Sequence, residues 1–144
     1  MVLTSDQAVI AISKAKSPLW PRDYTILPHP DDGMEVLVAT MSDAGRNANG
    51  VIVGQKIGRD IYKLNNLTWK HLEAAEWHAI LSLFEPNYFV TVRFPDPLRV
   101  GRFVTRRMYP GDRTAQPRFR YDENGKVEAL FYKGCKVNLI DTGE

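Results

Sequence analysis

The sequence predicts a mainly β protein of the α+β class, built as an antiparallel β-sandwich or barrel with one packed α-helix. Apolar residues alternate with polar residues at a period of two in several segments, which is typical of half-buried strands. Residues 72–84 instead show the 3.6-residue spacing of an amphipathic helix. The regular alternation of strands and helices that marks a parallel-sheet enzyme is missing. The predicted order is therefore strands, one helix, and a β-meander.

The chain of 144 residues has the length of one domain. Its 44% apolar and 25% charged residues lie near the averages of globular proteins, which argues against a disordered chain. The sequence lacks an apolar run of the ~20 residues that a membrane-spanning helix needs, and its start lacks the features of a signal peptide. We therefore expect a protein that is made and used in a cytosol, or that leaves the cell by lysis, and that has no membrane partner.

We divide the chain into an N-terminal arm, residues 1–34, and one β-rich domain with a helix, residues 35–144. Within the arm, residues 5–16 allow two structures: a short helix, or an extended segment that pairs with a neighbouring molecule. Four prolines, each of which removes a backbone donor, exclude a run of central strands or one long helix: Pro18, Pro21, Pro28 and Pro30.

The first part of the β-rich domain predicts two strands around a loop. Residues 35–41 alternate as a strand. Residues 42–50 are polar and rich in Gly and Asn, which predicts a loop that permits positive φ angles. Residues 60–69 predict another strand, in which a change of register indicates a β-bulge near Asn65 and Asn66.

The predicted helix runs from Leu72 to Phe84, about three turns. Pro86 follows it and ends the helical pattern. The spacing places one set of mostly apolar residues on a common face, which we expect to be buried: Leu72, Ala75, Ala79 and Leu83.

The chain returns to a period of two after the helix and predicts a meander of strands. Asn124-Gly125 lies between apolar runs, which indicates a tight hairpin. Lys133-Gly134 is expected to separate the last two strands. The alternating segments are residues 88–94, 100–109, 119–121, 127–132 and 136–140.

Cys135 is the only cysteine, and its apolar neighbours predict a small buried hydrophobic residue. Several aromatic side chains either form a sugar- or base-binding platform or belong to the core. Their placement at strand ends and on the amphipathic helix favours the core: Trp69, Trp77, Tyr88, Phe89 and Phe94.

The sequence lacks the motifs of common catalytic sites. It contains no Gly-x-x-x-x-Gly-Lys phosphate loop, no Gly-x-Gly-x-x-Gly and no Gly-x-Ser-x-Gly elbow. His71 and His78 lie about two turns apart on the predicted helix, too far to share a zinc ion. Asp31-Asp32-Gly33 lacks the further oxygen ligands of a calcium loop. We therefore predict no catalytic residue, no cofactor and no metal site, and a protein that is not an enzyme.

Charge is unevenly distributed, although the net charge is only +2. Residues 89–121 contain eight arginines, two aspartates and no lysine. Guanidinium groups make forked contacts with acids and phosphates, whereas a solvated strand face is the simpler explanation. Six arginines are candidates for charged contacts: Arg93, Arg99, Arg102, Arg106, Arg107 and Arg113.

Four segments are distinctive in combination: SDAGRNANG at residues 42–50, LTW at 67–69 leading into LE at 72–73, MYPGDR at 108–113 and GCKVNLI at 134–140. With these segments in this order, the chain resembles a family of short tail proteins that occurs in the tail gene clusters of siphophages and prophages of Gram-positive bacteria. The acidic-Gly-Arg-Asn loop and the Tyr-x-Gly-Asp-Arg turn are its most specific parts. The resemblance extends over about residues 35–142.

The resemblance implies a structural protein of the virion tail, assembled in the cytoplasm of the bacterial host and without catalytic residues. More distantly, it implies the fold of tail-tube and tube-like baseplate proteins, although a fold does not fix a function. The implied role is a tube-like subunit, a tail adaptor or a baseplate component. The implied partners are further copies in a hexameric or trimeric ring and other tail proteins, such as tube, tape-measure or distal tail proteins, with transient passage of DNA.

Ring-building proteins need edges and arms that pair with a neighbour, and heterologous contacts close into rings where the rotation allows. The polar loop and residues near it are therefore candidates for a subunit interface: Ser42, Asp43, Gly45, Arg46, Asn47, Gly50 and Arg59. Two other functions stay open at this point. One is an Arg-rich phage protein that binds nucleic acid through phosphates, and the other is a small phage inhibitor of a host defence enzyme.

Overall fold

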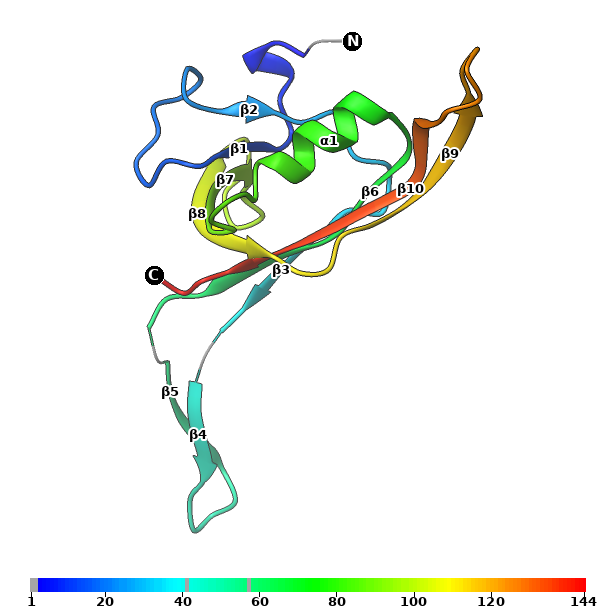
Figure 1. Cartoon of the computed structure of the whole chain (residues 1–144). Coiled ribbons are helices and arrows are strands. Elements are labelled where there is room, and N and C mark those ends of the chain that lie inside the picture. Colours follow the sequence, from blue (N-terminus) through cyan, green and yellow to red (C-terminus); the bar gives the residue numbers. More distant parts are fainter. Residues whose placement is uncertain (1–2, 41, 57) are drawn as a thin grey trace.

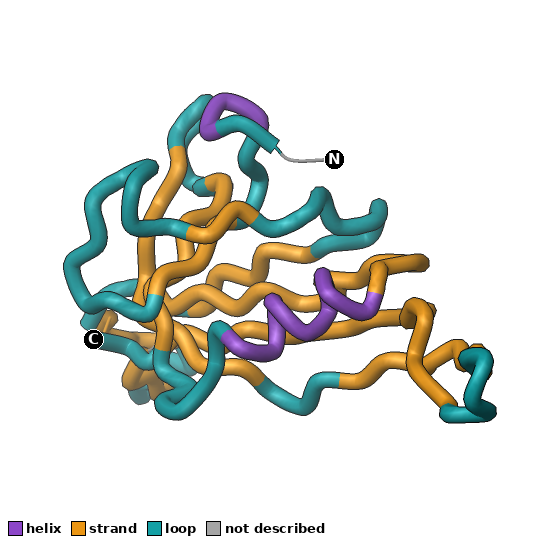
Figure 2. The backbone as a smooth tube through the Cα atoms, turned by 45° about the horizontal axis from the view of Figure 1, so that its top comes forward, coloured by secondary structure: helices purple, strands orange, loops and turns teal. Residues whose placement is uncertain are grey.

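The computed structural model describes residues 3–40, 42–56 and 58–144. Strands account for 47% of the chain and helices for 9%, which confirms a mainly β protein with one packed helix (Figures 1 and 2). The elements in chain order are η1 (Ser5–Gln7), β1 (Ala11–Ser13), β2 (Thr25–Ile26), β3 (Glu35–Ala39), β4 (Ser42–Arg46), β5 (Ile52–Lys56), β6 (Ile61–Glu73), α1 (Ala74–Ser82), β7 (Val90–Pro95), β8 (Phe103–Pro110), β9 (Thr114–Tyr121) and β10 (Val127–Asp141).

The described strands form one eight-stranded sheet and a separate two-stranded sheet, and all of their pairings are antiparallel. The order in the main sheet is β2-β1-β7-β8-β10-β6-β3, and β9 pairs with β10 beside this path. Side chains from β1, β7 and β8 meet those from β6 and β10 in one hydrophobic cluster. The sheet therefore curls around its core, and α1 lies over β6 and β10 (Figure 1).

The N-terminal residues contribute to the main sheet. β1 lies between β2 and β7, with Ile12 opposite Val92. Both structures expected for residues 5–16 are therefore wrong, since the segment forms only the short turn η1 and its extended part pairs within its own chain. The physical reason is burial: Ile10 and Ile12 are 0% and 1% exposed in the core.

Strand β6 contains the predicted bulge. Asn65 and Asn66 together lie opposite the single residue Asn138 of β10. Asn66 has a φ of 59°, and its backbone N–H donates a hydrogen bond to Asn138 Oδ1 at 3.1 Å. Because the extra residue shifts the alternation by one, both Leu64 and Leu67 point into the core and are fully buried.

Strand β10 is one continuous strand, so the predicted interruption at Lys133-Gly134 is wrong. Gly134 has a φ of 59°, and the pairing with β9 shifts in register next to it. The pairing with β6 continues through the same point without a shift. A glycine that adopts a positive φ lets the strand bend here without ending.

The helix starts later than predicted. Leu72 and Glu73 still pair with β10, so they are the last residues of β6 and not the first turn of α1. The same pairing places His71 in the strand. The backbone N–H of Glu73 donates to Glu76 Oε1 at 3.0 Å, which satisfies one donor at the start of the helix.

The buried face of α1 also differs from the predicted one. Ala75 and Ala79 are exposed, whereas Trp77 and Ile80 are 5% and 3% exposed. Leu83, just after the helix, is buried as expected. Burial of a large side chain removes far more apolar area from water than burial of an alanine, so the bulky residues turn the helix towards the core.

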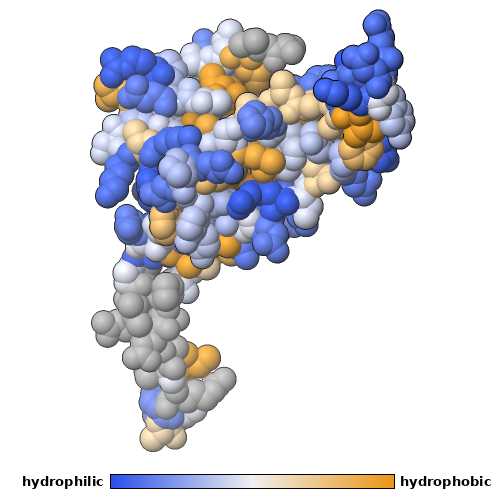
Figure 3. Space-filling model, in the orientation of Figure 1, coloured by the Kyte–Doolittle hydropathy of each residue, from blue (hydrophilic) through white to orange (hydrophobic). Residues whose placement is uncertain are grey.

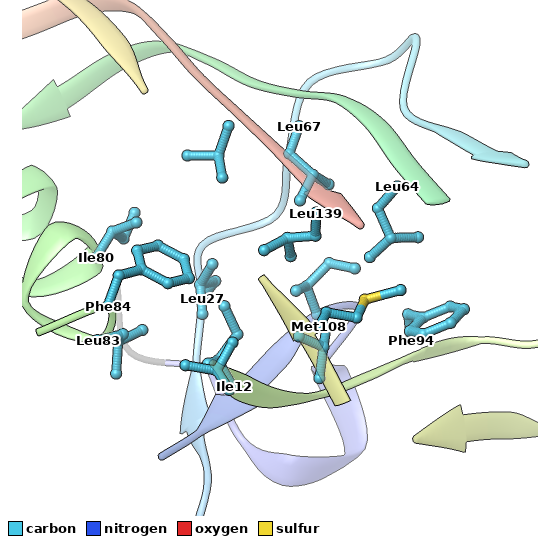
Figure 4. Packing of buried hydrophobic residues seen from close by; sticks show 14 of the residues in the cluster. Ile12, Leu27, Leu64, Leu67, Ile80, Leu83, Phe84, Phe94, Met108 and Leu139 are labelled. Atoms are coloured by element: carbon cyan, nitrogen blue, oxygen red, sulfur yellow. The ribbon is translucent and has the colours of Figure 1, made fainter. Parts of the chain in front are cut away.

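The core is a single hydrophobic cluster. Residues at the end of the helix converge with residues of β6, β7, β8 and β10 (Figure 4). Cys135 is fully buried, as predicted, and burial raises the pKa of its thiol. The expectation of a core role holds for Trp69, Trp77 and Phe94, which are at most 5% exposed.

Two of the aromatic residues expected in the core lie on the surface instead. Tyr88 and Phe89 are 49% and 37% exposed because they precede β7 and are not part of its inward alternation. Their rings stack on each other with centroids 4.6 Å apart, and both contact Tyr109 edge-on.

The bulge provides a test of the fold. Asn66→Val places a β-branched residue in the left-handed region, and we expect it to lower the free energy of unfolding by about 1–2 kcal/mol. Asn66→Gly is expected to change it by less than about 0.5 kcal/mol, because glycine adopts this conformation freely. Urea unfolding measures both variants. An equal loss in Asn65→Val, at the neighbouring position, would contradict the role of the positive φ.

Candidate subunit-contact surfaces

The segment predicted as the Ser42–Gly50 loop is mostly strand, so that prediction is wrong in its extent. β4 pairs with β5, from Ser42 opposite Lys56 to Arg46 opposite Ile52. The resulting hairpin stands away from the body (Figure 1). Residues 42–46 form a strand despite their polar composition because they pair with β5, and backbone hydrogen bonds across a hairpin form whether or not the side chains are apolar.

The turn of this hairpin contains two of the interface candidates. Asn47 Oδ1 accepts hydrogen bonds from the backbone N–H groups of Asn49 and Val51, at 3.0 and 3.1 Å. Gly50 has a φ of 77°, which fits the prediction of positive φ angles in this segment. Val51 and Ile52 follow and are 57% and 61% exposed.

The remaining candidates of this segment lie in strand β4. Gly45 is exposed there and pairs with Val53. The side chains of Ser42, Asp43 and Arg46 lie outside the described residues, so their contribution to an interface stays a prediction.

The structure gives Arg59 a role within its own chain. Its guanidinium donates two hydrogen bonds to the carboxylate of Asp141, from Nη1 to Oδ2 and from Nη2 to Oδ1, both at 2.7 Å. It also donates to the backbone carbonyls of Asp60 and Glu144. Arg59 thereby fixes the last residues of the chain to the start of β6.

Asp141 is the buried centre of this network. Its side chain is 0% exposed, and it also accepts hydrogen bonds from the backbone N–H groups of Tyr62 and Gly143, at 3.0 and 2.9 Å. Burial alone would raise the pKa of Asp141. The hydrogen bonds from Arg59, Gly143 and Tyr62 outweigh burial and hold the pKa below its ordinary value.

Three of the arginine candidates contact their own chain at separate places. The guanidinium of Arg93 lies between the rings of Trp20 and Phe103, 3.8 and 4.0 Å from their centroids. Arg107 donates to the carbonyl of Ala15 at 3.0 Å, and so ties the segment after β1 to β8. Arg113 donates to the carbonyl of Gly111, at 3.1 Å. These residues do not form one basic surface.

The other three arginine candidates, Arg99, Arg102 and Arg106, lie together. They line a groove of about 570 Å³ at the connection between β7 and β8, and we call it the arginine groove. Arg106 lies on the face of β8 opposite to Arg107, as the alternation predicts. The Arg106 guanidinium lies 5.2 Å from the ring centroid of Tyr62. Arg106 Nε is buried without a hydrogen-bond partner, the single such side-chain atom among the described residues.

Asp96 organises the arginine groove, and sequence reasoning missed it. Its carboxylate accepts hydrogen bonds from Arg99 at 3.0 Å, from the backbone N–H of Leu98 at 2.9 Å and from the Tyr62 hydroxyl at 3.2 Å. Burial opposes ionisation, but these hydrogen bonds hold the pKa of Asp96 below its ordinary value. The one available signal was its position between Pro95 and Pro97, where a rigid turn needs a side-chain acceptor.

A second hairpin, formed by β9 and β10, extends beyond the body. Its register pairs Phe119 with Ala129 and Tyr121 with Val127, so these side chains share one face. Phe119, Tyr121 and Val127 are 61%, 74% and 54% exposed. Figure 3 shows apolar surface on this hairpin next to its hydrophilic tip. The alternation predicted strands here, but it did not indicate that their apolar face is exposed to solvent.

The described residues contain no group of three or more His, Cys, Asp or Glu side chains placed to hold a metal ion. No helix in the same part of the chain has both the length and the apolar character needed to cross a membrane. Comparison with protein-family models, with curated proteins and with solved structures found no match.

The ion pair provides a test of the role of Arg59. Arg59→Ala leaves the buried carboxylate of Asp141 without its cation, and we expect the free energy of unfolding to fall by about 3 kcal/mol. Arg118→Ala, at an exposed position of β9, is the control and should change it by less than about 0.5 kcal/mol. Urea unfolding of dilute protein measures both. An unchanged stability of Arg59→Ala would contradict this role within the chain.

The lowered pKa of Asp141 predicts a pH dependence. Because the folded pKa lies below the unfolded value of about 3.9, the stabilisation is complete above that value and is lost as the pH falls through the folded pKa. Asp141→Asn should therefore be less stable than the wild type at pH 7, and the difference should shrink below about pH 4. Urea unfolding between pH 7 and pH 3 measures it. A difference that is constant over this range would argue against the assignment.

Proposed function

We propose that the chain is a structural component of a bacteriophage tail that works through ring-forming contacts between subunits. The observation that carries the proposal is the resemblance of four ordered segments to short tail proteins of siphophages and prophages. Within this proposal the chain is a tube-like subunit, a tail adaptor or a baseplate component. Its partners are further copies of itself and other tail proteins.

The two projecting hairpins support a role in assembly. Monomeric proteins rarely expose large contiguous apolar surfaces, and such surfaces mark interaction sites. The β9–β10 hairpin exposes Phe119, Tyr121 and Val127 on one face, and the β4–β5 hairpin exposes Val51 and Ile52. A two-stranded ribbon gains little stability alone, so both hairpins suit a protein whose arms are covered by neighbours.

The buried carboxylates also fit a structural protein. A general acid or base needs a pKa near the working pH and a site that a substrate can reach. Asp96 and Asp141 instead have lowered pKa values and accept hydrogen bonds from their own chain. Their positions hold a turn and a chain end in place.

Virions provide the test. A phage that carries the gene with an epitope tag is purified, and its tails are probed with a gold-labelled antibody. We expect labels at a fixed position along the tail, with the untagged phage as control. Tails that are intact and infectious but lack the protein would contradict the proposal.

A further inference from the structure

We propose that the tip of the β9–β10 hairpin of one copy binds in the arginine groove of a second copy of the chain. This inference rests on the proposed function and names the contact through which subunits associate. Three properties of the two surfaces support it: their charges, their apolar residues and their positions in the molecule.

The tip, residues 122–126, carries two acids and one lysine, a net charge of −1, and is held in one conformation. Asp122 and Glu123 are both exposed there. Asp122 Oδ1 accepts hydrogen bonds from the backbone N–H groups of Asn124 and Lys126, at 2.9 and 2.8 Å. Gly125 has a φ of 76°, which closes the turn. A turn that is already ordered loses little conformational entropy on binding, so the side chain of Glu123 is presented at a low cost.

The groove is basic and has unused hydrogen-bonding capacity. Asp96 pairs with Arg99, which leaves Arg102 and Arg106 without a carboxylate partner among the described residues. Arg106 Nη1 donates to the backbone carbonyl of Thr105 at 2.8 Å, but Arg106 Nε lacks any acceptor, and buried donors of this kind are rare in proteins. A carboxylate in the groove would accept charge-assisted hydrogen bonds from these guanidinium groups, the strongest class of such bonds.

Apolar residues flank the charges on both surfaces. Behind the acidic tip lie Tyr121 and Val127, 74% and 54% exposed. Val100 and Phe103, 104% and 42% exposed, line the groove, and Leu98 next to it in the chain is 55% exposed. An interface with a central charged contact and surrounding apolar contacts excludes water from the ion pairs and strengthens them.

The positions of the two surfaces make the contact head-to-tail. In Figure 1 the tip of the β9–β10 hairpin lies at the upper right, whereas β7 and β8 lie on the left of the body. One chain therefore cannot bring its own tip to its own groove. A contact between different surfaces of two copies is heterologous, and it closes into a ring when the rotation allows or continues as a filament.

A second copy fits the groove better than nucleic acid does. A phosphate backbone would pair with the arginines but would leave the apolar residues at the groove uncovered. Nucleic-acid sites also gather many cations along one surface, whereas three of the arginine candidates are engaged elsewhere.

Two charge reversals test the contact: Arg102→Glu in the groove and Glu123→Arg on the tip, both at exposed positions. Sedimentation of the wild type at rising concentration should show association that weakens with salt. Each reversal should weaken self-association by about tenfold or more. Arg113→Glu, an exposed arginine outside the groove, is the control and should associate like the wild type.

A mixture of the two single variants, and a chain that carries both substitutions, test whether the contact is head-to-tail. The Arg102→Glu protein keeps a normal tip and the Glu123→Arg protein keeps a normal groove. An equimolar mixture should therefore associate again, with the two variants alternating, because the normal tip meets the normal groove and the reversed tip meets the reversed groove. The chain that carries both substitutions has opposite charges on the two surfaces again and should recover self-association.

Several outcomes would overturn the inference. A wild type that stays monomeric, or reversals that leave association unchanged, would exclude this contact, and either result leaves the proposed function intact if tails still carry the label. Binding of a DNA or RNA oligonucleotide at low salt that Arg102→Glu abolishes, without association of the protein, would make nucleic acid the occupant. Circular dichroism of each variant confirms that it is folded.

Discussion

The antiparallel pairing of β6 with β10 is the interaction on which the rest of the structure depends. These two long strands carry the hydrophobic face that α1 covers, and β10 also pairs with β8 and β9. The bulge at Asn66 keeps the inward alternation of β6 in phase with the core. Asp141, the last residue of β10, accepts hydrogen bonds from Arg59 and so connects the end of β10 to the start of β6. One half of β10 thus builds the core, while its other half leaves the body as an arm.

The sequence predicts the features that depend on local patterns. The strand within residues 88–94, the Asn124-Gly125 turn and the bulge in β6 all follow from side-chain order and turn chemistry, although the strand starts only at Val90. The prediction errors arise where pairing with a neighbouring strand determines where an element begins or ends. Leu72 has helical spacing but stays in β6, since β10 extends far enough to pair with it. Gly134 bends β10 without ending it, because β6 continues on its other side.

The candidate contact surfaces were harder to predict because they depend on distant residues. Arg59 and Asp141 are far apart in the chain, and neither has a local pattern that points to the other. The arginines of residues 89–121 look alike in sequence, yet the structure divides them between aromatic stacking, backbone contacts and one groove. Alternation also marks Phe119 and Tyr121 as one face of a strand, but burial depends on what lies opposite, which no local signal carries.

An arm with an exposed apolar face must avoid indiscriminate pairing, and β9 has the properties that achieve this. Edge strands with charges and prolines resist edge-to-edge aggregation. β9 contains Pro117, which has no backbone N–H to donate, and Arg118 and Arg120 alternate with its apolar residues. The ion pair between Arg120 and Glu128 covers the face opposite to Phe119. Backbone pairing along this edge is therefore disfavoured, and in the proposed contact the specificity comes from the ordered tip, where Glu123 faces the arginine groove of a second copy.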